Sequence, residues 1–261
     1  MFIKTFIAYH RLNRVQRTLL WSGGAFGLLL LFILVAYLYV IVTLPDVDEL
    51  KSKNPQKTAL MELRLKQAAE QGKKLRIRQY WVPFRRIPKL MRQAVRITED
   101  ASFYKHHGID TDELWNAMKT NWMRGKYARG ASTITQQLAK NLYLSTEKSI
   151  WRKVREYFIA RELETNLSKN RIFHLYLNVI EWGPGVFGVE AAARYYFGVS
   201  VHQLTPSQMI RLTAIIPRPL TLDPRSRNSR LLWKCRWILR KLKLYGYITT
   251  KQYTTWLKNF Q

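Results

Sequence analysis

The sequence predicts an all-α domain behind a single N-terminal transmembrane helix. From Lys89 onward, apolar residues recur mostly at helical period, and no convincing run alternates as a strand would. Residues 18–44 contain no charged residue and are mostly apolar, so they exceed the roughly 20 residues that a bilayer-spanning helix needs. The 261-residue chain leaves ample length for one hydrophobic core outside that helix.

The residues that flank the apolar run predict its orientation. Basic residues precede it (Lys4, Arg11, Arg14 and Arg17), and acidic residues follow it (Asp46, Asp48 and Glu49). The positive-inside rule makes residues 1–17 a cytoplasmic tail and places everything after residue 44 outside. A cleavable signal peptide has an apolar core of about 7 to 15 residues and a small-residue cleavage site, so this longer run indicates an uncleaved anchor. Residues 45–78 are expected to form a stalk or linker, and residues 79–261 the folded domain.

Composition indicates an acidic partner. Lys and Arg total 44 against 17 Asp and Glu, a formal net charge of +27. Such an excess suits nucleic acid, an anionic membrane surface or a phosphate-bearing substrate. The outward placement argues against nucleic acid. Cys235 is the only cysteine, which excludes an internal disulfide framework and a cysteine-based metal site.

The first candidate site is the pair Glu99 and Asp100, followed by Phe103, His106 and Gly108. A carboxylate near the end of an apolar helix can act as a general base if burial raises its pKa toward neutrality. Alternatively, this is an ordinary helix end, stopped by the glycine. Adjacent histidines do not share a helical face and no third ligand is evident, so a histidine-held metal is not expected.

The second candidate site is the stretch from residue 129 to 145, read as an amphipathic helix. Two neighbouring lines of its polar face are Ser132, Gln136 and Lys140, and then Thr133, Gln137 and Asn141, preceded by Gly130. An ordinary solvated face favours Glu, Lys and Arg. Uncharged donors and acceptors indicate a ligand rich in hydroxyls, amides and phosphate, although a plain amphipathic helix remains the alternative.

Two further segments carry charge or glycine. In the segment from Trp151 to Glu156, Arg152, Arg155 and Glu156 share a helical face, which suits phosphate binding or, alternatively, an exposed salt-bridged turn. The glycines at 183, 185 and 188 have dinucleotide-site spacing but lack its strand and acidic residue. A tight loop before a helix over residues 189–197 is expected instead.

Together these segments resemble the peptidoglycan glycosyltransferase family (glycosyltransferase family 51), found in bifunctional penicillin-binding proteins and monofunctional transglycosylases. Five blocks match in order: Glu99 to Gly108, Gly130 to Asn141, Arg152 to Glu156, Gly183 to Gly198, and Leu212 to Pro219. The match covers about residues 80–219. Without a transpeptidase domain in the sequence, the chain looks like the monofunctional type.

The resemblance implies a lysozyme-like fold, with a head and a smaller jaw that rests on the membrane. It implies that lipid II is polymerised by an inverting transfer that releases undecaprenyl diphosphate. Glu99 is then the general base and Glu156 the second carboxylate, near the diphosphate. Substrate or diphosphate is contacted by Ser132, Thr133, Gln136, Gln137, Lys140, Asn141, Arg152 and Lys153. Supporting motif positions are Asp100, Phe103, His106, Gly108, Gly130, Gly183, Gly185 and Gly188.

The same resemblance sets expectations for cofactors, partners and location. No tightly bound cofactor is expected, only a divalent cation (Mg or Mn) with the diphosphate near Glu156. The partners are lipid II, the growing glycan chain, anionic lipids and other cell-wall synthesis or division proteins, with no nucleic acid. By analogy with the monofunctional members, the membrane is the cell inner membrane and the domain is periplasmic.

The C-terminal segment is basic and aromatic. Its cations are Arg225, Arg227, Arg230, Lys234, Arg236, Arg240, Lys241 and Lys243, interleaved with Trp233, Trp237 and Leu239. We expect this segment to lie on anionic lipid headgroups. The alternative is a solvated basic helix that caps the core.

Two other functions compete with lipid II polymerisation. A lysozyme-like hydrolase also uses a catalytic glutamate in a helical fold, but it needs a second carboxylate flanking the scissile bond. A membrane-anchored polyanion-binding protein without catalysis is supported by the net charge alone.

Overall fold

The computed structural model describes residues 14–125, 130–147 and 149–261, and it divides into two compact units, Met1–Leu44 and Pro45–Gln261. The first unit is the helix α2 (Arg14–Val42). Within it, Trp21–Val42 is 22 residues long and apolar enough to cross a membrane. The structure therefore has a helix that is suitable for the predicted membrane span. Lys4 and Arg11 of the predicted cytoplasmic tail lie outside the described residues.

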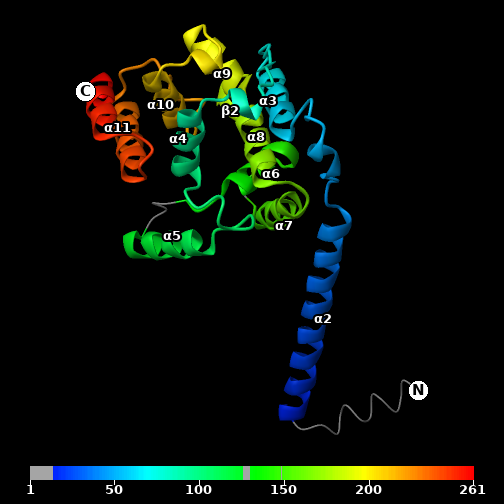
Figure 1. The fold of residues 1–261 in the computed structure, drawn as a ribbon. Helices are drawn as coiled ribbons and strands as arrows, with labels where there is room; N and C mark the ends of the chain where they lie inside the picture. Colours follow the sequence, from blue (N-terminus) through cyan, green and yellow to red (C-terminus); the bar gives the residue numbers. More distant parts are fainter. Residues whose placement is uncertain (1–13, 126–129, 148) are drawn as a thin grey trace. The chain divides into compact units, whose positions relative to one another are not determined.

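The second unit is mostly helical, as the sequence predicts (Figure 1). Its α-helices are α3 (Ala59–Glu70), α4 (Lys89–Glu99), α5 (Thr111–Arg124), α6 (Ile134–Tyr143), α7 (Ile150–Asn166), α8 (Lys169–Val179), α9 (Val189–Phe197), α10 (Pro206–Ile215), α11 (Ser229–Leu244) and α12 (Thr250–Leu257). Short 3-10 helices cover Asp48–Lys51, Phe84–Arg86, Val201–Gln203 and Lys258–Phe260. The strands are β1 (Arg78–Gln79), β2 (Glu181–Gly183) and β3 (Val186–Phe187).

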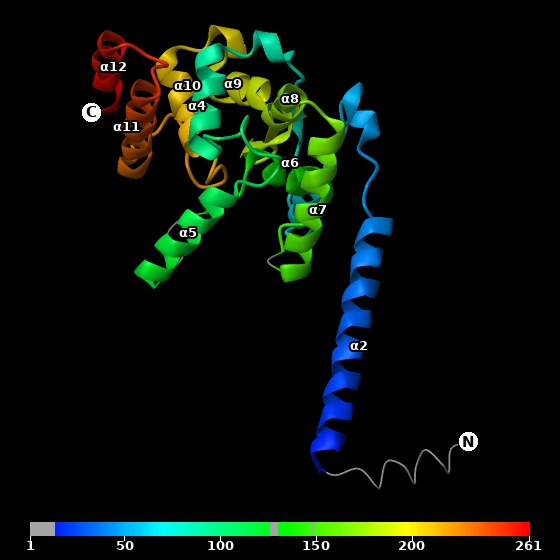
Figure 2. The ribbon, with the colours of Figure 1, turned by 60° about the horizontal axis from the view of Figure 1, so that its bottom comes forward.

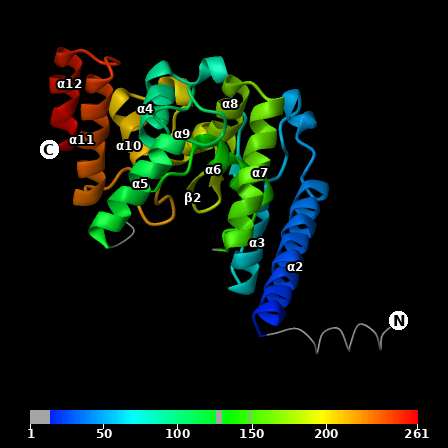
Figure 3. The ribbon, with the colours of Figure 1, turned by 90° about the horizontal axis from the view of Figure 1, so that it is seen from below.

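Two groups of helices form the body of this unit. Helices α4, α10, α11 and α12 form one group. In the other group, α3, α7 and α8 each pack against α6. Figures 2 and 3 show these groups from two further directions. On α4 the buried apolar residues are Met91, Ala94, Val95 and Ile97, which the helical period places on one face. Packing of this face fixes the position of α4. It therefore fixes the position of Glu99, the last residue of the helix.

A small sheet departs from the predicted all-α domain. β3 pairs in parallel with β1, where Arg78 lies opposite Val186, and antiparallel with β2. The strands are too short for alternation to reveal them in the sequence. Between β3 and α9, Gly188 has φ +81°, and a Cβ there would lie 2.5 Å from the Asn178 carbonyl oxygen. This confirms the tight loop, which is followed by a helix over the predicted residues 189–197.

The linker expected over residues 45–78 is instead part of the second unit. Leu60 and Met61 of α3 are buried against Phe187. The Arg64 guanidinium contacts the buried Glu181 carboxylate through Nε and a terminal nitrogen, at 2.8 to 3.0 Å. Apolar burial and a bidentate ion pair therefore hold α3 on the domain.

Candidate active site

Glu99 is the last residue of α4 and lines a cleft of about 780 Å³. Its side chain is half-buried, and burial raises the pKa of its carboxyl group above the ordinary value of 4.5. A hydrogen bond from Gln137 and the positive charges of Lys234 and Lys140 act in the opposite direction. Glu99 is thus a carboxylate that holds a proton more readily than a solvated one, as a general base requires.

A hydrogen-bond relay fixes the orientation of Glu99. Gln137 Nε2 on α6 donates to Glu99 Oε2 at 3.1 Å, and the Tyr176 hydroxyl on α8 donates to Gln137 Oε1 at 3.0 Å. Gln137 was expected on a ligand-binding face, but in the structure its amide contacts the candidate base. Sequence periodicity finds Gln137 on the polar side of α6 but gives no sign of Tyr176, which sits in an apolar run.

Asp100 and His106 support the turn that follows Glu99. Asp100 Oδ2 accepts from the Ile134 backbone N–H at 3.0 Å, and both Asp100 oxygens lie 3.0 Å from His106 Nε2. Phe103 in the same turn is fully buried. These contacts tie the end of α4 to the start of α6, so the motif acts on Glu99 through the backbone.

The start of α6 differs from the helical stripe that the sequence suggests. The helix begins at Ile134, so Ser132 and Thr133 precede it. Thr133 Oγ1 accepts from the Gln136 N–H at 3.2 Å and donates to the Gly108 carbonyl at 2.6 Å, while Gln136 Oε1 accepts from the Thr133 N–H at 3.1 Å. Thr133 and Gln136 therefore form a capping box and are occupied with helix structure. The third residue of the second line, Asn141, is buried on α6.

Glu156 lies in an environment opposite to that of Glu99. It is buried on α7, where Arg152 Nη1 donates to its Oε2 at 2.5 Å and Lys153 Nζ donates to its Oε1. The Lys140 ammonium on α6 is close enough for Glu156 to oppose the lowering of its pKa by burial. Three cations thus surround one buried carboxylate, which leaves the cluster with net positive charge suited to an oxyanion.

A second hollow, of about 740 Å³, reaches this cluster. Lys153 and Gln136 line it, and it shares Ala131 and Ser132 with the cleft at Glu99. Lys153 Nζ lies 3.3 Å from the Ser132 hydroxyl on that shared wall. Ser132 is exposed and Gly130 lines the first cleft, so the segment before α6 separates two adjoining binding spaces.

The residues around Glu156 do not fit a divalent cation held by the protein. No group of three metal-ligating side chains among the described residues includes Glu156. A different group does exist, because the structure brings Asp110 to Asp100 and His106, with ligand atoms within 4.8 Å of one another. Sequence reasoning finds no such third residue. However, the Asp110 carboxylate already accepts hydrogen bonds from the Ser102 hydroxyl and the Glu113 N–H, and the Asp100 carboxylate accepts one from the Ile134 N–H. These carboxylates are therefore already engaged in hydrogen bonds within the protein.

Comparison with known proteins identifies the family of the chain. The family model described as transglycosylase matches residues 66–243. The chain belongs to the transglycosylase family. It is 44% identical over 214 residues to a biosynthetic peptidoglycan transglycosylase of Nitrosomonas eutropha, covering 82% of this chain and 88% of the relative. A protein of the same name from Methylobacillus flagellatus is 40% identical over 227 residues, covering 87% and 97%.

This transglycosylase has cleft residues on α11 that its sequence does not reveal as such. Trp233, Lys234, Trp237 and Lys241 line the cleft that contains Glu99. Lys234 Nζ lies 4.2 Å from the centre of the Trp237 ring, and the pKa of its ammonium is lowered by burial and raised by Glu99. These residues of the basic segment therefore lie at the cleft, and contact of the segment with lipid stays a prediction. The sequence signal for these cleft residues is the alternation of basic and aromatic side chains, but the same alternation fits a membrane surface equally well.

Helix α5 exposes an apolar surface at the rim of the second hollow. Leu114 and Met118 line the hollow and are exposed, and Trp122 on the same helix is 89% exposed. In sequence such spacing is typical of a core face. In Figures 1 and 2 the helix extends away from the body of the second unit, which explains why these side chains are not buried.

Proposed function

We propose that this transglycosylase joins lipid II units into glycan strands by inverting transfer, with release of undecaprenyl diphosphate. The observation that carries the proposal is the contrast between Glu99, which lines one hollow, and the buried Glu156, whose partner Lys153 lines the adjoining hollow. Glu99 has a raised pKa and a cleft before it, whereas Glu156 is neutralised by cations. A transfer that expels a diphosphate needs a base at one centre and positive charge at the other.

Glu99 acts on the acceptor. The 4-hydroxyl of an acceptor sugar in the first cleft gives its proton to the Glu99 carboxylate as its oxygen attacks C1 of the donor. The C1–O bond to the diphosphate breaks, and its electron pair leaves with the diphosphate. Attack from the face opposite the leaving group inverts the configuration at C1. Gln137 and Tyr176 act as positioning residues because they hold one Glu99 oxygen in place.

The cations around Glu156 act on the leaving group. Lys153 lines the second hollow, and Lys140 and Arg152 lie beside it in the same charged cluster around Glu156. Together they stabilise the charge that develops on the departing diphosphate oxygen. Glu156 holds Arg152 and Lys153 in fixed positions rather than taking part as a second acid or base. A hydrolase that uses two carboxylates is disfavoured by this pairing.

The anchor and the exposed surfaces suit a substrate that stays in the bilayer. We infer that α2 crosses the inner membrane with its N-terminus in the cytoplasm, which leaves the second unit on the periplasmic side. The exposed apolar face of α5 enters the headgroup region, and the exposed cations Arg230, Arg240 and Lys243 of α11 contact anionic lipids. Sedimentation with anionic vesicles should weaken when these three cations are neutralised, and unchanged binding would refute the contact.

Polymerisation of labelled lipid II by the full chain in detergent tests the catalytic proposal. The wild type should give ladders on a gel that lysozyme digests. Glu99→Gln should give no polymer, because the amide cannot accept the proton. Glu70→Gln makes the same chemical change at an exposed position on α3 and should behave as the wild type. An active Glu99→Gln enzyme would remove Glu99 from the mechanism.

A further inference from the structure

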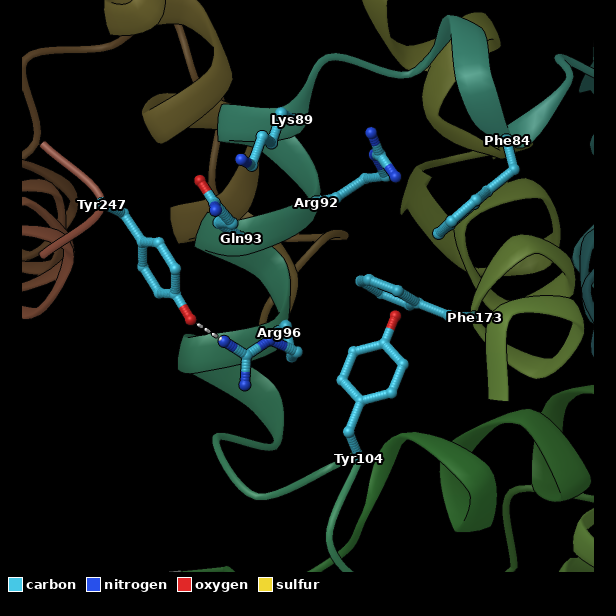
Figure 4. Close-up of a pocket in the computed structure, with 8 residues that line it drawn as sticks. All are labelled: Phe84, Lys89, Arg92, Gln93, Arg96, Tyr104, Phe173 and Tyr247. Atoms are coloured by element: carbon cyan, nitrogen blue, oxygen red, sulfur yellow. Dashed lines mark hydrogen bonds between the residues drawn. The ribbon is translucent and has the colours of Figure 1, made fainter. Parts of the chain in front are cut away.

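A separate hollow of about 360 Å³ lies against the face of α4 (Figure 4). Its lining includes the cations Lys89, Arg92 and Arg96 and the rings of Phe84, Tyr104 and Phe173. None of its lining residues lines either of the two hollows at Glu99 and Glu156. The mechanism above therefore leaves this hollow without a role.

The hollow is positively charged without compensation. Lys89, Arg92 and Arg96 follow each other at spacings of three and four on α4, so all three reach the same face. Among the described residues that line the hollow, none is acidic. No ion pair in the described part of the chain joins these three cations to a carboxylate, whereas the half-buried Lys169 has Glu164 at 2.7 Å. Uncompensated charge in a hollow is costly, and an anion relieves that cost.

The guanidinium groups are already held in place. Arg92 Nε donates to the Ile87 carbonyl at 3.1 Å, and its guanidinium carbon lies 4.6 Å from the centre of the Phe84 ring. No described residue accepts from its two terminal nitrogens. Arg96 Nη1 donates to the Ala101 carbonyl at 2.6 Å. Its Nη2 donates to the Tyr247 hydroxyl, which the dashed line in Figure 4 marks. Fixed donors bind an oxyanion with little loss of side-chain entropy.

Aromatic rings form the remaining wall. The Phe84 and Phe173 rings meet edge to face with centroids 5.9 Å apart, and in Figure 4 the Tyr104 ring lies next to Phe173. Tyr104 is half exposed, and its hydroxyl donates to Asn170 at 3.0 Å. Phe173 is buried, and the half-buried Phe84 and half-exposed Tyr104 rings offer a surface for an apolar or planar group attached to the anion.

We propose that this hollow binds a phosphomonoester dianion that carries an apolar or planar group. A phosphomonoester has close to two negative charges and three terminal oxygens, which match three cations better than a single carboxylate does. The same headgroup chemistry occurs in soluble phosphate esters and in phosphatidic acid. The site is independent of the proposed lipid II reaction, because it uses none of the residues assigned to that reaction.

Calorimetric titration of the full chain in a neutral maltoside detergent tests the site. The probes are phenyl phosphate, inorganic phosphate and benzoate. Phenyl phosphate should bind most tightly, because it alone satisfies both the cations and the rings. Lys89→Gln combined with Arg92→Gln should weaken its binding by about tenfold or more, since charge-assisted hydrogen bonds are lost.

Matched variants separate this site from general basicity and from the catalytic hollows. Arg85→Gln combined with Arg86→Gln removes the same charge from two exposed neighbours and should leave binding unchanged. Lys140→Gln alters the diphosphate site and should also leave it unchanged. Equal weakening in the Arg85 and Arg86 variant, or loss in Lys140→Gln, would overturn the proposal. If the Lys89 and Arg92 variant does not fold, the exposed Lys89→Gln alone should still weaken binding severalfold.

Vesicles distinguish the two sources of the ligand. Binding to neutral vesicles supplemented with phosphatidic acid, lost in the Lys89 and Arg92 variant, would assign the site to a lipid headgroup. Phenyl phosphate binding without such vesicle binding would assign it to a soluble ester. Absence of both refutes the site.

Discussion

Replacing Gln137 with methionine removes one hydrogen bond from Glu99 while keeping the length of the side chain. In the structure Gln137 Nε2 donates to Glu99 Oε2 at 3.1 Å, and this bond lowers the pKa of the carboxyl group. A hydrogen bond to a charged group contributes about 1.5 kcal/mol, which corresponds to about one pH unit. Its loss raises the pKa of Glu99, so the base is ionised only at higher pH.

The pH dependence of kcat/KM for lipid II polymerisation measures this effect. The acidic limb should move up by about one pH unit in Gln137→Met, so the rate falls about tenfold on that limb and recovers at higher pH. Tyr176→Phe should move the limb in the same direction by less, because only the group that orients Gln137 is lost. Gln71→Met, at an exposed position, is the control. A limb that stays in place or moves down would refute the relay.

Four other changes follow from the same contacts. Glu99→Gln should raise the melting temperature at pH 7 but not at pH 4. The carboxyl group of Glu99 has a raised pKa in the folded state, so the protein loses stability as the pH rises from 4.5 through that pKa. Lys234→Met should move the acidic limb of the rate profile up, since its charge lowers the pKa of Glu99. Arg152→Met should lower kcat about 100-fold in the gel assay through loss of charge at the leaving group. Gly188→Ala should lower the free energy of unfolding, measured with denaturant, by about 2 kcal/mol or more, because φ is +81° and the new Cβ would meet the Asn178 carbonyl. An unchanged value for any of the four variants would contradict the corresponding contact.

Local patterns account for much of what the sequence predicts correctly. The glycines before residue 189 and the helical period after it specify α9, because both act between near neighbours. The uncharged run specifies α2 for the same reason. The sequence does not predict the sheet, because its strands contain only two or three residues. Their pairing also joins residues that are far apart in the sequence, such as Arg78 and Val186.

The candidate site is only partly predictable, because side chains with the same periodicity have different uses. Gln136 and Gln137 both lie on the polar side of α6, yet one caps the helix and the other contacts Glu99. Lys234 reaches the cleft only through the packing of α11 on α4 and α10, which no local pattern encodes. Trp122 has the spacing of a core residue but lies on a helix with little to pack against.

The most direct test of the central claim is to measure undecaprenyl diphosphate and new glycosidic linkages together, in one reaction of the full chain with lipid II. Transfer predicts about one diphosphate released for each linkage formed, β-1,4 linkages in the product, and neither product from Glu99→Gln. Diphosphate release with free reducing sugars and no new linkages would show attack by water. That result would contradict the assignment of the Glu99 cleft to an acceptor sugar.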